Sequence, residues 1–181
     1  RHANIEKVTM VEIDGEVIKA CKEHLPEIAA SFDDPRLELI VDDGIAFVKN
    51  APDAIYDLLI VDGSDPVGPA EGLFSVDFYQ NCYRTLKADG ILVAQGESPK
   101  FNEKAFRELN HTLQDIFGSD KAPVSLFFVP TYPTGMWSFQ YGLKGNIEGP
   151  IHQKEAEIET FVSTHGLRYY NGALHNGSFA L

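Results

Sequence analysis

The segment Leu58-Leu59-Ile60-Val61-Asp62-Gly63-Ser64-Asp65-Pro66-Val67-Gly68-Pro69 decides the fold of this chain. Its four consecutive apolar residues predict a strand that is buried on both faces, which is typical of parallel sheets. The residues that follow combine two carboxylates with glycines and prolines, so the strand leads into a stiff, sharply turned loop. This pattern indicates an α/β protein whose functional groups follow the carboxyl ends of its strands.

The remainder of the sequence alternates strands and helices. We expect strands at residues 8–12, 37–41, 58–61, 91–94, 124–129 and 136–143, and helices at 16–30, 45–50, 76–86, 102–117 and 155–164. Pro26 should end or kink the first helix, Asn102 should cap the fourth, and residues 167–181 should form loop and strand. The alternation predicts one α/β domain with a mostly parallel sheet, helices on both faces and an antiparallel edge hairpin.

The composition narrows the class of partner. The 181 residues carry a net charge of −12 and the pI is about 4.8, so we expect no nucleic acid or anionic lipid partner. No apolar run reaches the roughly 18 residues of a membrane span. Cys21 and Cys82 lie in apolar helical patterns, which indicates buried thiols in a reducing compartment such as the cytoplasm. No spacing of Cys and His is typical of a metal site.

Acidic residues follow the first two strands. Asp14 and Asp42 are interpreted as turn or helix-cap residues, the commonest role of an Asp after a strand. Glu12 could instead grip the hydroxyls of a ribose, as an acid at the end of a strand in a nucleotide-binding unit does. Asp43 could accept from an adenine amino group while Gly44 lets the backbone approach, although a simple turn fits this pair equally well.

The loop after the third strand has the more specific pattern. Asp62 and Asp65 suit a cationic ligand, because one carboxylate can take a proton from an ammonium while the other holds its charge. The alternative is a proline-rich surface turn. Tyr132 and Trp137 flank the predicted hairpin turn, and aromatic faces attract ammonium groups. The alternative for these two is an aromatic pair that only packs the hairpin.

Six segments resemble spermidine synthases in order and spacing. They are Val11-Glu12-Ile13-Asp14, Asp43-Gly44, Asp62-Gly63-Ser64-Asp65-Pro66-Val67-Gly68-Pro69-Ala70, Leu73-Phe74, Gln95-Gly96-Glu97 and Pro130-Thr131-Tyr132-Pro133-Thr134-Gly135. The resemblance continues to Tyr169-Tyr170-Asn171 and His175, so it covers essentially the whole chain. The Asp-rich loop is its most diagnostic element. The resemblance implies a Rossmann-like, methyltransferase-type α/β fold.

The family transfers an aminopropyl group from decarboxylated S-adenosylmethionine to putrescine, giving spermidine and methylthioadenosine. The resemblance implies these two partners here, with the nucleoside as a co-substrate, no cofactor, no metal, and a cytoplasmic homodimer or homotetramer. It implies that Asp62 is the base that deprotonates the attacking amine. It assigns the nucleoside to Glu12, Asp43, Gly44, Pro69, Ala70 and Leu73, and the diamine to Asp65, Gln95, Tyr132 and Trp137.

The sequence also departs from the family pattern. The family's glycine-rich loop and its β-rich N-terminal portion do not occur, so we expect residues 1–181 to form a catalytic domain that is incomplete at its N-terminus. Lys100 stands where many relatives have Trp. Two alternatives stay open: an S-adenosylmethionine-dependent methyltransferase acting on an amine such as putrescine, and a non-catalytic relative.

Overall fold

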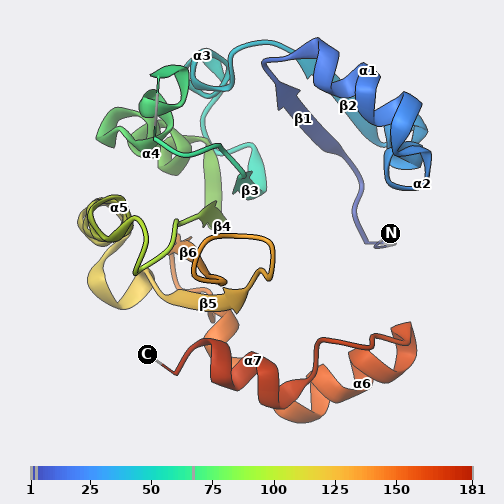
Figure 1. Cartoon of the computed structure of the whole chain (residues 1–181). Coiled ribbons are helices and arrows are strands. Elements are labelled where there is room, and N and C mark those ends of the chain that lie inside the picture. The colour runs from blue at the N-terminus through green and yellow to red at the C-terminus, as the bar shows by residue number, and fades with distance from the viewer. Residues whose placement is uncertain (1, 3, 67, 181) are drawn as a thin grey trace. The chain divides into compact units, whose positions relative to one another are not determined.

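The computed structural model of the chain describes residues 2, 4–66 and 68–180, with the side chain of Pro69 also outside the description. The chain forms two compact units, Arg1–Ala51 and Pro52–Leu181. Figure 1 follows the elements of both units in chain order. No helix within the described ranges is both long and apolar enough to cross a bilayer.

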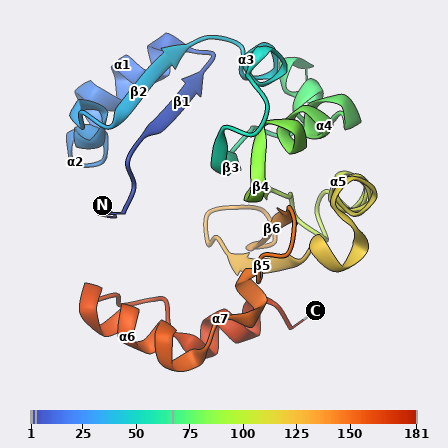
Figure 2. The same ribbon diagram turned by 180° about the vertical axis from the view of Figure 1, so that it is seen from behind.

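The first unit is a parallel strand pair with short helices. Strands β1 (Val8–Glu12) and β2 (Leu37–Val41) run parallel, and Val8 pairs with Leu37 at one end and Glu12 with Val41 at the other (Figure 2). The helical elements are α1 (Gly15–His24), α2 (Pro26–Ala29), η1 (Ala30–Asp33) and α3 (Gly44–Asn50). The expected first helix therefore breaks before Pro26, because proline cannot donate the hydrogen bond of a helix interior.

The second unit contains a four-stranded sheet. Its strands are β3 (Tyr56–Val61), β4 (Leu86–Gln95), β5 (Val124–Phe128) and β6 (Met136–Leu143). They lie in the order β3-β4-β6-β5, and β3 runs parallel to β4. Strand β6 is antiparallel to both of its neighbours. The predicted antiparallel edge hairpin is thus confirmed. Its second strand, β6, lies between β4 and β5, so its first strand, β5, forms the edge of the sheet.

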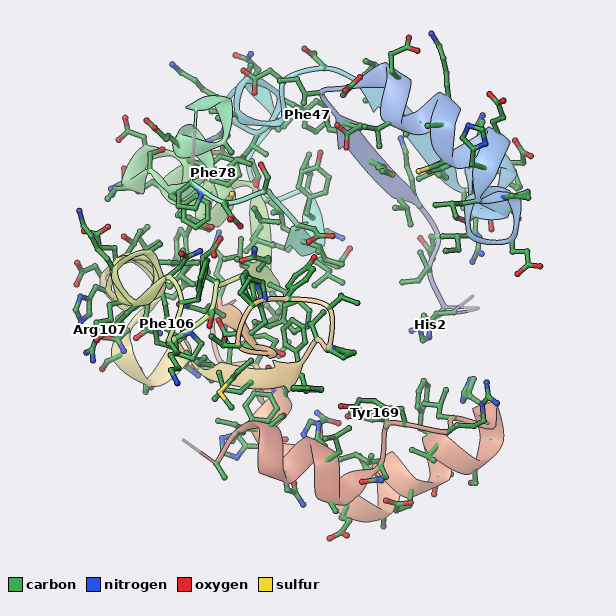
Figure 3. The ribbon with its side chains drawn as sticks, in the orientation of Figure 1. His2, Phe47, Phe78, Phe106, Arg107 and Tyr169 are labelled. Atoms are coloured by element: carbon green, nitrogen blue, oxygen red, sulfur yellow. The ribbon has the colours of Figure 1, made fainter. Side chains whose placement is uncertain are left out.

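Helices pack on this sheet and on one another. They are η2 (Gly68–Phe74), α4 (Val76–Thr85), α5 (Glu103–Phe117), η3 (Ser119–Lys121), η4 (Pro150–His152), α6 (Glu155–His165) and α7 (Gly172–Ser178). Helix α4 packs on β4, α5 packs on β6, and the two helices contact each other. Figure 3 marks Phe78 on α4 and Phe106 on α5. Tyr79, Cys82, Leu92 and Leu113 are fully or almost fully buried in this core.

Three segments of the second unit differ from the prediction. Strand β4 begins at Leu86 and not at the expected residue 91, and it contains a bulge, since Tyr56 pairs with Leu86 and Leu58 pairs with Ile91. Leu58 and Ile60, which share one face of β3, are 48% and 65% exposed, so this strand is not buried on both faces as expected. Residues 172–178 form α7 where loop and strand were expected.

Candidate active site

Three segments that carry predicted site residues meet at one edge of the second unit's sheet. Val61 pairs with Ala94, so Asp62 leaves β3 beside the end of β4, where Gln95 lies. Gln95 pairs with Phe139 near the start of β6. The turn that carries Tyr132 joins β5 to β6 at this same edge. The strand order therefore brings an acid, an amide and a phenol to one end of the sheet.

The Asp62 loop is open to solvent and backed by η2. The side chains of Asp62 and Asp65 are both exposed. A Cβ added to Gly63 would lie 2.8 Å from Leu73 Cδ1, so the η2 segment folds back against the loop. Ala70 of the same segment is buried. Of the predicted nucleoside residues, Leu73 thus packs against Gly63 and Ala70 is buried in the same segment, whereas the side chain of Pro69 lies outside the described part of the chain.

The aromatic pair of the β5–β6 hairpin has one exposed and one buried member. The rings of Tyr132 and Trp137 meet edge to face, with their centroids 4.9 Å apart and their planes at 72°. Tyr132 is 49% exposed and Trp137 is 4% exposed. The indole Nε1 of Trp137 finds no hydrogen-bond partner among the described residues. The buried Trp137 ring therefore packs against Tyr132, whose side chain is about half exposed in the turn between β5 and β6.

Backbone hydrogen bonds hold the turn that carries Tyr132. The amide of Tyr132 donates to the carbonyl of Val129 at 3.1 Å, and the amide of Gly135 donates to the carbonyl of Tyr132 at 3.0 Å. Val129 N donates to Gly135 O at 2.8 Å, which closes the turn. Thr134 has a φ of 64°, a left-handed conformation that is unfavourable for a β-branched residue. Three backbone hydrogen bonds therefore define the conformation of this turn.

A buried cluster that was not predicted from the sequence follows Gln95. Glu97 is fully buried and has a φ of 65°. Its backbone amide donates to Gln95 Oε1 at 2.6 Å, and its carboxylate accepts from Gln95 Nε2 at 3.3 Å. The motif Gln95-Gly96-Glu97 was a visible signal, but nothing in the sequence indicated that Glu97 binds Gln95.

Asn102 corrects one sequence prediction. It occupies the residue before α5, as expected, but its side chain makes no capping hydrogen bond. The Asn102 amide donates to Glu97 Oε2 instead. The backbone N–H groups of Lys100 and Phe101 are bound by the hydroxyl of Ser98, at 3.4 and 3.1 Å. The side-chain amide of Asn102 therefore binds the buried Glu97 carboxylate and does not cap α5.

The predicted site residues of the first unit follow its two strands. Glu12 is half-buried and accepts from the backbone amide of Asp14 at 2.9 Å. Asp14 caps α1 by accepting from Glu16 N, which confirms its interpretation as a cap. Asp43 likewise caps α3, because its Oδ1 accepts from Ile45 N at 2.8 Å.

Gly44 leaves room beside the Asp43 cap. A Cβ added at Gly44 would meet nothing within 4 Å, so the backbone there is open to a ligand. Asp42 accepts from the backbone amide of Asp43 at 2.8 Å, which fits its interpretation as a turn residue. Within residues 2, 4–66 and 68–180, no group of three or more His, Cys, Asp or Glu side chains is arranged to hold a metal ion.

Comparison with known proteins identifies the family. Residues 1–148 match the spermine/spermidine synthase domain. The polyamine aminopropyltransferase of Moorella thermoacetica is 46% identical over 181 residues, which are 100% of this chain and 61% of that protein. The chain thus spans about three fifths of the length of the curated relatives it matches.

Two solved structures are similar in fold. A spermidine synthase in complex with the transition-state analogue AdoDATO has a TM-score of 0.89 and 35% identity, over 99% of this chain and 60% of that one. The spermidine synthase from Thermotoga maritima has a TM-score of 0.87 and 34% identity, over 99% and 59%. These similarities confirm the expected Rossmann-like, methyltransferase-type α/β fold. The chain belongs to the spermine/spermidine synthase family.

Proposed function

We propose that the protein containing this chain is a spermidine synthase. It transfers the aminopropyl group of decarboxylated S-adenosylmethionine to putrescine and releases spermidine and methylthioadenosine. The names of the relatives support an aminopropyl transfer, and the similar structure with a bound transition-state analogue supports a nucleoside donor. The two cysteines of this chain, Cys21 and Cys82, are both free and favour a reducing compartment, so we propose that the protein acts in the cytoplasm.

The observation that carries this proposal is the pair of exposed acids at the sheet edge. Asp62 and Asp65 follow β3, and Gln95 and Tyr132 reach the same edge from β4 and from the β5–β6 turn. Carboxylates, an amide oxygen and an aromatic ring are groups that bind ammonium ions. This edge is therefore suited to a small, cationic amine.

The chemistry requires a base more than any other group. The carbon attacked is a methylene bonded to a positively charged sulfonium, so its bond to sulfur is already activated. The amine nitrogen arrives protonated and has no free lone pair, so a nearby base must remove one proton. The nitrogen then forms a bond to the methylene carbon, and the electrons of the broken C–S bond stay on sulfur. We assign the proton transfer to Asp62 and the charge of the bound diamine to Asp65.

The remaining assignments complete the proposal. Gln95 and Tyr132 orient the diamine, and Trp137 supports Tyr132. Glu12 binds ribose hydroxyls, and Asp43 accepts from the adenine amino group through the oxygen that does not cap α3. The nucleoside also contacts Gly44, Pro69, Ala70 and Leu73. The donor is a co-substrate, and the homodimer or homotetramer implied by the resemblance stays a prediction.

A donor and acceptor competition tests the proposed function. The complete protein is offered decarboxylated or intact S-adenosylmethionine, each with an equal mixture of isotope-labelled putrescine and unlabelled cadaverine, agmatine and spermidine, so that newly formed spermidine differs in mass from the spermidine supplied. We expect product only with the decarboxylated donor, and we expect spermidine, identified by mass, to exceed the other products. Transfer of a methyl group from the intact donor alone would make the protein an amine methyltransferase and would contradict the proposal.

A further inference from the structure

The side-chain amide of Gln95 is held at both ends by one residue. Its Oε1 accepts from the backbone amide of Glu97 at 2.6 Å, and its Nε2 donates to the Glu97 carboxylate at 3.3 Å. A backbone N–H can only donate, so it fixes which end of the Gln95 amide is oxygen. One lone pair of Oε1 and one hydrogen of Nε2 remain for a ligand. An ammonium can only donate, so it must use that lone pair.

Glu97 is itself fixed by residues on both sides of it. Its carboxylate accepts from the amide of Asn102, and its backbone carbonyl accepts from Ser138 Oγ at 2.8 Å. It is fully buried and has a left-handed backbone, which a non-glycine residue adopts only when its surroundings hold it there. The Glu97 carboxylate that accepts from Gln95 Nε2 is therefore also held by the side chain of Asn102.

A second hydrogen bond connects this cluster to the Tyr132 turn. Ser98 Oγ lies 3.2 Å from Thr134 Oγ1, and Ser98 is fully buried. The Ser98 oxygen already accepts from the amides of Lys100 and Phe101, so its single proton points to Thr134. Thr134 is the left-handed residue of the turn. The segments that carry Gln95 and Tyr132 are thus joined by one hydroxyl pair.

We propose that four residues form a positioning network for the diamine: Glu97, Ser98, Asn102 and Thr134. This proposal rests on the proposed function. The network holds Gln95 Oε1, with its free lone pair, and the hydroxyl of Tyr132 at a fixed distance from each other, so that both groups bind the same amine. The network touches the diamine only through Gln95 and Tyr132, and it leaves the nucleoside untouched.

The test breaks the joining hydrogen bond in the complete protein. Thr134→Val keeps the branched shape at this φ but removes the acceptor, whereas Thr134→Ser keeps the oxygen. We expect Thr134→Val to raise the KM for putrescine about tenfold, the effect of one hydrogen bond, with the KM for the donor changed less than about twofold. Thr134→Ser should restore most of the affinity for putrescine.

Ser125→Ala is the matched control. Ser125 is also buried and its hydroxyl lies 3.0 Å from the hydroxyl of Tyr141, so this variant loses a comparable bond within the β5–β6 pair. It should leave the KM for putrescine unchanged. A Thr134→Val enzyme with the wild-type KM for putrescine, or a Ser125→Ala enzyme with the same increase, would overturn the positioning role.

Hydrogen exchange gives a result that does not depend on turnover. In Thr134→Val we expect faster amide exchange in segments 97–102 and 129–135 together, and in Ser125→Ala in neither. If the wild-type protein transfers no aminopropyl group, the proposed function fails and the exchange data alone decide the network. Unchanged exchange in either of the two segments would refute the connection between them.

Discussion

The thiol of Cys82 differs sharply from that of Cys21. Cys82 is fully buried in α4, and burial raises its pKa to about 12 from the ordinary value of 9.0. Cys21 is half-buried. Because only the thiolate reacts with alkylating reagents, we expect iodoacetamide at pH 8 to modify Cys21 in the folded protein and Cys82 only after unfolding. Peptide mass spectrometry measures both.

The raised pKa of Cys82 also predicts a loss of stability in alkali. The folded state keeps the Cys82 proton while the unfolded state loses it above pH 9, so the contribution is complete below pH 9 and disappears as the pH rises towards 12. The free energy of unfolding then falls by at most about 1.4 kcal/mol per pH unit, because one proton is involved. Urea unfolding should be less dependent on pH in Cys82→Ala, and Cys21→Ala should follow the wild type. Equal slopes in both variants would contradict this account.

The end of β6 and the bulge of β4 form a close backbone contact. Lys144 N donates to Gly90 O at 3.0 Å, and the Lys144 ammonium donates to the carbonyls of Tyr83 and Leu86, both at 2.7 Å. The next residue, Gly145, has a φ of 74°, and a Cβ there would lie 2.3 Å from the carbonyl oxygen of Ala88. A side chain at 145 must therefore push against backbone.

Gly145→Ala tests this contact between elements. We expect it to lower the free energy of unfolding by about 3 kcal/mol, because left-handed strain and a steric clash add. Gly166→Ala is the control, because Gly166 has a φ of 61° with open space around its Cβ position. It should lower the free energy of unfolding by only about 1 kcal/mol. Equal losses in chemical denaturation would show that the close contact is unimportant.

Most elements could be predicted because their patterns are local. The apolar runs of β1, β2 and β3, and the break before Pro26, are visible in short stretches of sequence. Helix α7 was missed because it contains two glycines, which disfavour a helix. Its support is tertiary: His175 lies 2.7 Å from both the hydroxyl of Tyr170 and the carbonyl of Pro150.

The candidate site was predictable at the level of the whole sheet but not in its details. Strand order alone brings Asp62, Gln95 and Tyr132 to one edge. The support beneath them depends on contacts between distant residues, such as Ser98 with Thr134, and on left-handed backbone at residues other than glycine. Asn102 is one example: the sequence predicted that it caps α5, but in the structure its side-chain amide donates to the carboxylate of Glu97.

The central claim is that Asp62 removes a proton from the bound amine. The turnover of the Asp62→Asn enzyme tests this claim most directly. The complete protein is assayed with saturating putrescine and decarboxylated S-adenosylmethionine. We predict that kcat falls about a hundredfold or more, the typical contribution of a general base.

The control for this measurement lies on β3, the strand that precedes Asp62. Asp57 of β3 is exposed and forms an ion pair with Lys87 at 2.7 Å, a surface pair with little energetic weight. Asp57→Asn should therefore keep the wild-type kcat. A hundredfold loss confined to Asp62→Asn is the predicted result, and an Asp62→Asn enzyme with near-normal turnover would contradict the account.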